Sequence, residues 1–271
     1  MKPKIMFSSR VFGNDVQVIL DYAVTEGYDG VEWYLNSFRL RTSKKHREQF
    51  FEKLDQYPGL YYTFHLPTVD VELAHREPII SGASLGYLQL YIEYLAPWFL
   101  KQDVPPVLTL HVGSNSISVE ELDWEVALTN LKQLGDFAAQ RNGVVLLENL
   151  KVGWTTDPKT HLQMADHAGL GITFDTGHAA SNPLVRSGEL HLVDYADALS
   201  QKIRHVHFYA YESLDQGRHM PPETWMDVAE IWSKVVALPD AQSVVLELST
   251  EEELAKTFDL LMDNKDKWQG R

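Results

Sequence analysis

The feature of this sequence that most constrains its fold is a regular alternation of short apolar runs with longer stretches of helical periodicity. The apolar runs are rich in Val, Ile, Leu and aromatic residues, which favour strands. We identify eight of them, at residues 4–9, 30–35, 60–67, 107–113, 144–150, 171–177, 203–211 and 243–249. Strands that alternate with helices build a parallel sheet, because each helix carries the chain back to the start of the next strand. The pattern therefore predicts an α/β protein.

Two parallel-sheet architectures fit this alternation, an open doubly wound sheet and a closed (β/α)8 barrel. The open sheet normally carries a glycine-rich phosphate loop after its first strand, and no G-x-G-x-x-G occurs in SSRVFGND. Eight β/α units within 271 residues fit the barrel. Since no linker or low-complexity tract divides the sequence, we expect a single TIM-barrel domain over residues 1–271.

Several of the expected helices carry capping signals at their N-termini. A capping residue accepts a hydrogen bond from the first turn, and a capping box adds a Glu or Gln three positions later. The signals are found at Asn14–Asp15, Ser118 with Glu121, Asp157–Pro158, and Thr250 with Glu253.

Composition excludes several classes of site. The chain has no cysteine, so disulfides, thiolate nucleophiles and cysteine-bound zinc are excluded. The formal net charge of −14 argues against broad nucleic-acid affinity. A local basic run nevertheless follows the second strand and includes Arg39, Arg41 and Lys44. We find neither a signal-peptide core nor an apolar run as long as a membrane helix, and we therefore expect a cytoplasmic protein without a membrane partner.

Metal-capable side chains stand late in strand after strand, at positions where barrel strands are normally apolar. They are His65, His111, Glu148, Asp175, His207 and Glu247, and His178 follows the sixth strand in FDTGH. The C-terminal ends of barrel strands meet at one mouth, and burying so much charge there is costly unless a cation compensates it. Without cysteine the ligands must be His, Asp, Glu or water, which favours Mn, Mg, Co or Zn. We therefore predict a divalent-metal site at the C-terminal mouth.

The other histidines receive simpler interpretations. His205 has the same strand parity as His207, so both can point inward, and we interpret His205 as a hydrogen-bonded residue deeper in the barrel. Five histidines that fall in expected loops or helices are interpreted as surface residues: His46, His75, His161, His167 and His191.

Taken in order, these segments resemble the xylose-isomerase-like TIM-barrel superfamily, which includes sugar isomerases, sugar epimerases and endonuclease IV. The segments that carry the resemblance are HLP, LHVGS, LENL, FDTGH, HVHF and LELS, between residues 65 and 249. The resemblance implies that Glu148, Asp175, His207 and Glu247 hold the shared metal, and that His178 contacts the substrate or a further metal. Related barrels often pair through their helical shell, so a homo-oligomer is compatible with the resemblance, but the sequence leaves the oligomeric state open.

The function that this resemblance first implies is a sugar or sugar-phosphate isomerase or epimerase. In such an enzyme a divalent cation stabilises an enediolate while Glu148 and Glu247 move the proton between carbons. Phe7, Trp33 and Trp154 lie near strand ends and either pack on the apolar face of the sugar or belong to the core. The basic run is either a phosphate contact or a solvated helix face.

The second implied function is a metal-dependent nuclease of the endonuclease-IV type, whose partner would be DNA with abasic sites. Of that family's nine ligands the chain keeps eight: His65, His111, Glu148, Asp175, His178, His207, His219 and Glu247. The ninth, an Asp, is replaced by Gly217, although Asp215 lies two residues upstream. A third interpretation is a barrel that binds a metal or small ligand without catalysis, and the presence of both glutamates speaks against it. We favour the sugar enzyme, because it needs fewer ligands and no duplex-binding surface.

Overall fold

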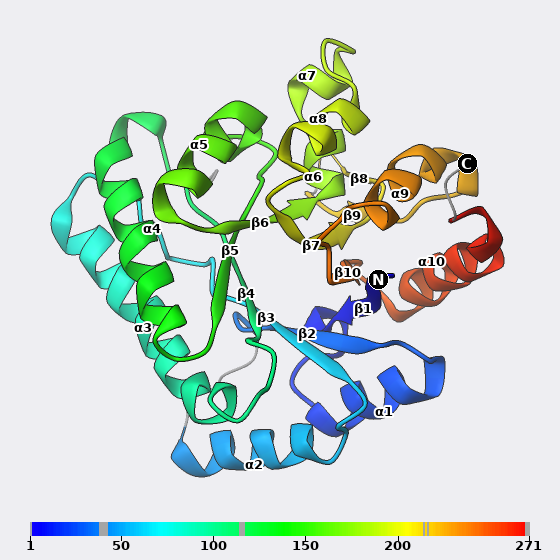
Figure 1. Ribbon diagram of the computed structural model, residues 1–271, viewed down its shortest axis with the longest axis horizontal. Helices are drawn as coiled ribbons and strands as arrows, with labels where there is room; N and C mark the ends of the chain where they lie inside the picture. Colours follow the sequence, from blue (N-terminus) through cyan, green and yellow to red (C-terminus); the bar gives the residue numbers. More distant parts are fainter. Residues whose placement is uncertain (1, 38–42, 114–116, 214, 216, 269–271) are drawn as a thin grey trace.

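Eight parallel strands close into a barrel, in the order β1-β10-β7-β6-β5-β4-β3-β2. The structure is a computed structural model that describes residues 2–37, 43–113, 117–213, 215 and 217–268. Figure 1 shows the strands as a ring surrounded by helices, which confirms the predicted (β/α)8 fold. The barrel strands are β1 (Lys4–Ser8), β2 (Gly30–Tyr34), β3 (Tyr61–His65), β4 (Val107–Leu110), β5 (Val144–Glu148), β6 (Gly171–Asp175), β7 (Ile203–Phe208) and β10 (Ser243–Leu246).

Each barrel strand is followed by a helix that packs outside the ring. These helices are α1 (Val16–Glu26), α2 (Lys44–Asp55), α3 (Pro78–Phe99), α4 (Trp124–Ala139), α5 (Pro158–Ala168), α8 (Leu192–Leu199), α9 (Ala229–Val236) and α10 (Glu251–Asp263). Two insertions add α6 (Thr176–Ser181) and α7 (Pro183–Arg186) after β6, and the hairpin β8 (Tyr211–Glu212) with β9 (His219–Met220) after β7. The short 3-10 turns are η1 (Ser9–Phe12), η2 (Val119–Glu121), η3 (Trp154–Thr156), η4 (Trp225–Asp227) and η5 (Lys265–Lys267).

The strand predictions are confirmed in number and order, but several strands end earlier than expected. The pairing of β4 stops at Leu110 and that of β10 at Leu246, so His111 and Glu247 lie just beyond their strands. The apolar run at 203–211 divides into β7 and the first strand of the β8–β9 hairpin. The polar residues at the mouth thus stand where the backbone leaves the barrel.

Three of the four predicted helix starts are confirmed. Asp15, Asp157 and Thr250 cap α1, α5 and α10, each accepting a hydrogen bond from the first turn. The prediction at Ser118 is wrong, because its hydroxyl donates to Glu120 and only the turn η2 follows. The helix α4 starts later, where the Asp123 carboxylate accepts a 3.0 Å hydrogen bond from the amide of Val126.

The two faces of the barrel strands bury different chemistry. Outward-facing residues such as Phe64 and Phe208 are fully buried in the apolar layer between strands and helices. Trp232 of α9, for example, packs edge-on against Phe208 at 4.8 Å between ring centroids. The inward-facing positions are mixed: Met6, Leu146 and Val245 are apolar, and the polar side chains among them are Glu32, Thr63, Thr109, Thr173, His205 and Ser243. The interior of the barrel therefore holds several buried polar side chains below the mouth.

Two of the three aromatic residues with open assignments belong to the apolar layer. Phe7 packs against Tyr22 and Tyr28, and Trp33 meets Phe50 at 4.9 Å between ring centroids. Both are fully buried on the outward face of their strands, so they cannot pack on a sugar at the mouth. Trp154 lies in η3, half-buried, with its ring 5.3 Å from that of Trp124.

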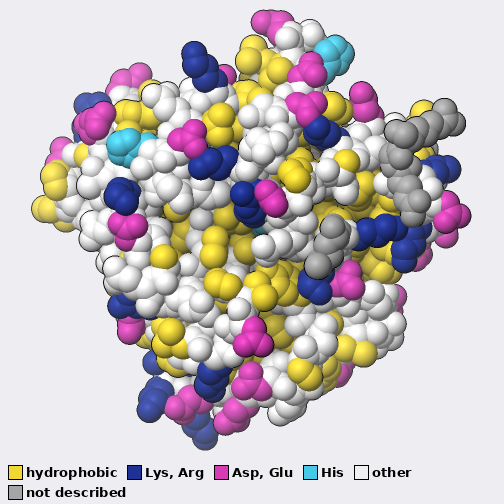
Figure 2. All heavy atoms as spheres, viewed as in Figure 1, with side chains coloured by type: hydrophobic (Ala, Val, Ile, Leu, Met, Phe, Trp, Pro, Cys, Tyr) yellow, Lys and Arg dark blue, Asp and Glu magenta, His cyan; other side chains and the backbone are white. Residues whose placement is uncertain are grey.

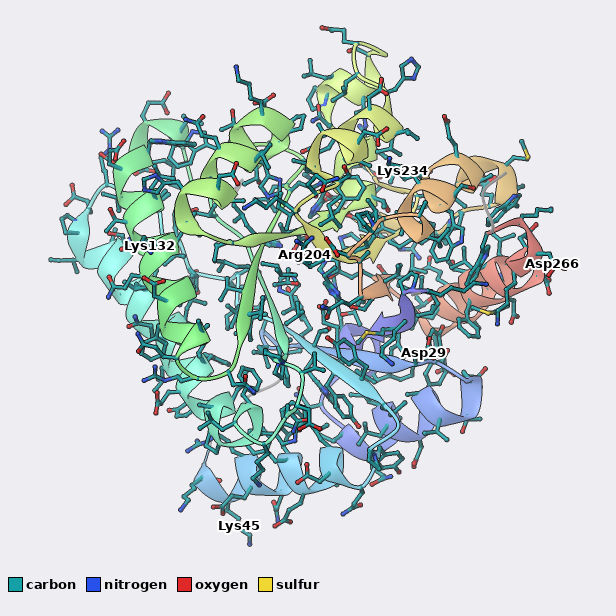
Figure 3. The ribbon with its side chains drawn as sticks, viewed as in Figure 1. Asp29, Lys45, Lys132, Arg204, Lys234 and Asp266 are labelled. Atoms are coloured by element: carbon teal, nitrogen blue, oxygen red, sulfur yellow. The ribbon has the colours of Figure 1, made fainter. Side chains whose placement is uncertain are left out.

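Many of the exposed charged side chains lie on the outer helices. Figure 3 places Lys45, Lys132 and Asp266 on the periphery and Arg204, at the start of β7, near the middle of the ring. Figure 2 shows side chains of both charges spread around the outline of the same face. Lys44 is exposed at the start of α2 and pairs with Glu48 at 3.5 Å, whereas Arg39 and Arg41 lie outside the described residues. Among the described helices none has the length and apolar character needed to cross a membrane.

Candidate metal centre

Four metal-capable side chains converge at the C-terminal mouth of the barrel. They are Glu148 at the end of β5, Asp175 at the end of β6, His207 in β7 and Glu247 just after β10. One ligand atom of each lies within 4.8 Å of those of the others, and the residues are at most 3% exposed. Parallel pairing of β6 with β7 places Asp175 beside His207. The strand β10 pairs with the other side of β7, also in parallel, so Glu247 follows at the same end of the barrel. The structure therefore brings together the four residues that the family resemblance implied as metal ligands.

His207 lies at the centre of this cluster. Its Nδ1 atom is 3.3 Å from Glu148 Oε1, 3.3 Å from Glu247 Oε2 and 3.9 Å from Asp175 Oδ2. The other oxygen of Asp175 accepts a 2.7 Å hydrogen bond from the amide of His178 and caps α6. Asp175 Oδ2 is buried and has no hydrogen-bond partner among the described residues. A buried carboxylate oxygen without a partner is costly, and a cation at this point would satisfy it.

A second group shares Glu148 with the first. His65, His111 and Glu148 also place ligand atoms within 4.8 Å of one another. Glu148 Oε2 lies 2.8 Å from His111 Nε2 and 3.3 Å from His65 Nε2, while Oε1 faces His207. The Nδ1 atom of His65 donates to the carbonyl of Leu66 at 2.9 Å, which directs its Nε2 into the mouth. Glu148 therefore stands between two groups of ligands.

His178 occupies the side of the mouth nearest the β8–β9 hairpin. Its Nδ1 atom donates to the carbonyl of Asn149 at 3.0 Å, and its Nε2 atom lies 3.6 Å from Glu212 Oε2. The preceding Gly177 is needed for close approach, because a Cβ atom there would lie 1.9 Å from the ring of Tyr209. His178 is thus held by backbone contacts beside the four-residue cluster.

Glu212 is a site residue that the sequence analysis missed. It is 7% exposed, its Oε1 atom is 2.6 Å from Lys151 Nζ, and its Oε2 atom has no hydrogen-bond partner among the described residues. Asp215, the expected replacement for the missing acid, is exposed instead. The short hairpin turns Glu212 inward and Asp215 outward, which no local sequence pattern indicates. A glutamate four residues after the HVHF segment was the available signal.

His219 lies on the same hairpin but outside the tight groups. Its Nδ1 atom donates to the carbonyl of Glu247 at 2.8 Å, and its ring stacks on Tyr209 with 3.9 Å between centroids. Its ring centroid is 6.0 Å from that of His178. None of the groups of potential ligands formed by the described residues includes His219.

The electrostatics of the mouth indicate a deficit of positive charge. Burial raises the pKa of Asp175 to about 8, and the negative charges of Glu148 and Glu247 act in the same direction. Burial alone would lower the pKa of His178, but the charges of Asp175 and Glu148 outweigh it and raise that pKa to about 10. Burial disfavours the charged form of Glu148 too, yet His111 and His207 hold its pKa well below the usual range. The donor set, the partnerless oxygen and this charge balance all fit a divalent cation.

Two histidines interpreted as surface residues are in fact buried. His161 of α5 is fully buried, and its Nε2 atom donates to the carbonyl of Leu147 at 3.1 Å. His75 is 7% exposed and accepts a hydrogen bond from the amide of Glu77. The interpretation was wrong because residues in a helix or loop can still face the barrel. His46, His167 and His191 are exposed as expected.

His205 and Glu32 lie below the metal-capable cluster, inside the barrel. His205 bonds Ser243 and Glu32 through its two ring nitrogens, at 2.7 and 2.9 Å, which agrees with the interpretation of a hydrogen-bonded histidine. Glu32 was missed, although a glutamate at an inward position of the apolar run GVEWYL is a visible signal.

A closed parallel barrel with buried carboxylates and histidines gathered at its C-terminal mouth defines the class of protein. The chain belongs to the xylose isomerase-like TIM barrel family, whose model matches residues 20–263. This confirms the family indicated by the motif order.

Individual proteins are similar to this chain in sequence or in fold. The chain is 26% identical over 157 residues to an uncharacterised protein of Methanocaldococcus jannaschii, a match that covers 58% of the chain and 65% of that protein. A D-tagatose 3-epimerase-like protein superposes with a TM-score of 0.73 at 18% identity, covering 97% of each chain. D-psicose 3-epimerase from Clostridium cellulolyticum H10 gives a TM-score of 0.73 at 12% identity, covering 98% of this chain and 100% of that one. At these identities the structural likeness shows a shared fold.

Proposed function

We propose that the protein is a divalent-metal-dependent isomerase or epimerase that acts on a sugar or sugar phosphate. The observation that carries this proposal is the cluster of Glu148, Asp175, His207 and Glu247, with ligand atoms within 4.8 Å of one another. Its support from comparison is that one solved neighbour of the same fold is named D-psicose 3-epimerase and another a D-tagatose 3-epimerase-like protein. Fold likeness alone does not assign chemistry, so the proposal rests on the site.

The four residues of the cluster would hold the cation. Mn, Mg, Co or Zn is compatible with a set of carboxylate and imidazole donors. When bound, the cation would supply a Lewis acid that stabilises negative charge developing on the oxygens of the substrate.

Glu148 and Glu247 would carry the proton transfer. One carboxylate removes a proton from the carbon beside the carbonyl, and the electron pair moves to the carbonyl oxygen to give an enediolate. The other carboxylate, acting as its conjugate acid, returns a proton to the opposite face for epimerisation. For isomerisation the proton returns to the neighbouring carbon. Both residues are nearly inaccessible to solvent, which protects the transferred proton from exchange with water.

His178 and Lys151 would orient the substrate. His178 Nε2 points toward Glu212, and Lys151 is one-third exposed at the same side of the mouth. Both are hydrogen-bond donors within reach of a ligand that enters beside the β8–β9 hairpin. The phosphate contact of the basic run remains a prediction, as do the cytoplasmic location and self-association of the chain.

A metal-dependent phosphodiesterase of the endonuclease-IV type is the second candidate, and a specific observation favours it. The group of His65, His111 and Glu148 would hold a second cation that shares Glu148 with the first. A shared carboxylate is a usual feature of two-metal hydrolytic sites. The single-metal enzyme needs only one of the two groups, so the number of bound ions separates the candidates.

The first experiment is elemental analysis of purified protein, followed by assay. About one divalent ion per chain, together with epimer formation from ketoses or their phosphates in the presence of Mn²⁺, would support the proposed function. Two or three zinc ions per chain with cleavage of abasic-site DNA would replace it by the second candidate. If neither substrate class gives turnover or changes the tryptophan fluorescence, the result would favour a non-catalytic barrel.

The variant His219→Ala sharpens this choice. His219 lies outside the four-residue cluster, so a one-metal epimerase should keep most of its metal affinity in this variant. A nuclease of the endonuclease-IV type, which would use His219 as one of its ligands, should lose metal-dependent cleavage of abasic DNA. His191→Ala, at an exposed position, is the matched control.

A further inference from the structure

Directly below the proposed metal ligands, the interior of the barrel holds a fully buried carboxylate. Glu32 projects inward from β2, in register with Thr63 of β3, and has no solvent exposure. Barrel interiors are normally filled by branched apolar side chains, and a buried carboxylate is strongly destabilising unless it is paired. The contacts of Glu32 therefore call for an explanation.

Glu32 stands between two histidines of β7. Its Oε2 atom lies 2.9 Å from His205 Nε2 and accepts a 3.1 Å hydrogen bond from Thr63 Oγ1. Its Oε1 atom is in ion-pair contact with His207 Nε2 at 3.0 Å, and the described residues offer neither of these two atoms an in-line hydrogen bond. Each oxygen of Glu32 thus lies within 3.0 Å of a nitrogen of a different imidazole.

The two nitrogens of His207 face in opposite directions. Nδ1 faces Glu148 and Glu247, each at 3.3 Å, whereas Nε2 faces Glu32. A histidine that ligates a metal through one nitrogen usually donates its other N–H to a carboxylate, which fixes the ring and its tautomer. Glu32 Oε1, at 3.0 Å, is the carboxylate oxygen within reach of a proton on Nε2, and a proton held there would leave Nδ1 for the cation.

The lower contacts hold Glu32 in that position. Ser243 Oγ lies 2.7 Å from His205 Nδ1, so a hydroxyl proton donated there leaves the His205 proton on Nε2, directed at Glu32. A cation bound by Glu32, His205 and His207 instead would need a free lone pair on His205. Both nitrogens of His205 are already engaged.

We propose that Glu32 is a positioning residue for the metal centre, which orients His207 through Nε2 and is itself held by His205, Thr63 and Ser243. The inference rests on the proposed metal site and adds a residue that does not touch the substrate. It explains why a carboxylate and a histidine occupy an interior level where apolar residues would pack.

The test is Mn²⁺ affinity of the full chain, measured by titration calorimetry for the wild type, Glu32→Gln and a control. Glu32→Gln keeps the shape of the side chain but removes its charge, and we expect it to weaken Mn²⁺ binding by about 10- to 100-fold. Thr109→Val is the control, because Thr109 is equally buried in the interior but bonds Thr173 at 3.0 Å. The control should bind Mn²⁺ within about threefold of the wild type.

The outcomes separate this inference from the proposed function. A wild-type chain that binds no divalent cation overturns both. If the wild type binds Mn²⁺ but Glu32→Gln binds it with the same affinity, only the positioning role is overturned. The positioning role is also overturned if Thr109→Val loses as much Mn²⁺ affinity as Glu32→Gln.

A second measurement does not depend on any variant folding. In nitrogen-15 spectra of histidine-labelled, zinc-loaded wild-type protein, His207 should show a metal-bound Nδ1 and a protonated Nε2. Coordination through Nε2, or a proton on Nδ1, would overturn the proposal.

Discussion

The outward and inward faces of the barrel strands differ in kind, although they alternate along the same residues. Outward, Phe64, Leu147 and Phe208 are fully buried in an apolar layer that the helices cover. Inward, Glu32, Glu148 and His207 are just as buried but are charged or polar. Apolar burial stabilises the fold wherever it occurs, whereas buried charge is costly unless it is paired. We infer that the outer face mainly stabilises the fold, whereas the buried charges of the inner face are less favourable for stability and serve the candidate metal centre.

The largest effect on activity is expected when charge is removed from the inner face. Glu247→Gln should lower turnover by about 10²- to 10⁴-fold, because a proton-transfer group is lost. The unfolding temperature should change by only a few degrees, since the side chain keeps its shape. Assays of epimer formation and thermal unfolding measure the two effects, with the exposed Glu230→Gln as control. Wild-type turnover in Glu247→Gln, or in the corresponding Glu148→Gln, would contradict the two-base mechanism.

Removing an outer-face side chain should have the opposite signature. Trp232 is fully buried against Phe208 and Trp268, so Trp232→Ala should cost about 3–5 kcal/mol in the free energy of unfolding. Mn²⁺ affinity of the folded fraction should stay unchanged. Denaturant titration measures the loss, and Met226→Ala, at an 81% exposed position, should cost less than about 0.5 kcal/mol. A loss below about 1 kcal/mol in Trp232→Ala would mean that the outer layer is not the source of stability.

His161 of α5 is fully buried where the helix contacts β5, and it should make stability depend on pH. Burial lowers its pKa to about 4 from an ordinary value of 6.5, so between these values the unfolded chain binds more protons than the folded one. Its contribution is fully present above pH 6.5 and is lost as the pH falls toward 4, by about 3 kcal/mol.

This dependence is measured as the difference between unfolding free energies at pH 7 and pH 4.5. The difference should shrink in His161→Gln and stay at its wild-type value in His167→Gln, an exposed position of the same helix. An unchanged difference in His161→Gln would show that other groups dominate the acid response.

The smallest effect is expected on the solvent side of the helices. Lys132 and Asp136 form an exposed pair at 3.2 Å on α4, and such pairs contribute about 0.3–0.5 kcal/mol. Lys132→Ala should therefore change the free energy of unfolding by no more than this and leave turnover unchanged. A loss above about 1 kcal/mol would place part of the stability outside the apolar layer.

Much of this architecture follows from local patterns. The apolar runs, their alternation with helices and the caps at Asp15, Asp157 and Thr250 depend on residues that are neighbours in the chain. The late position of Glu148 and Asp175 in their strands placed them at the mouth, because all strands of a parallel barrel end there. Ser118 does not cap a helix, because its hydroxyl donates to Glu120, which is nearer in the sequence than the expected partner Glu121.

The sequence by itself determined the barrel, the family and the group of residues at the mouth. Only the tertiary structure decided which partner each residue meets, as for Glu32 and His205, which are 173 positions apart. It likewise buried His161 and turned Glu212 rather than Asp215 into the site. The physical reason is that periodicity and capping depend on near neighbours, whereas pairing inside a barrel depends on strand register and closure, which join distant segments.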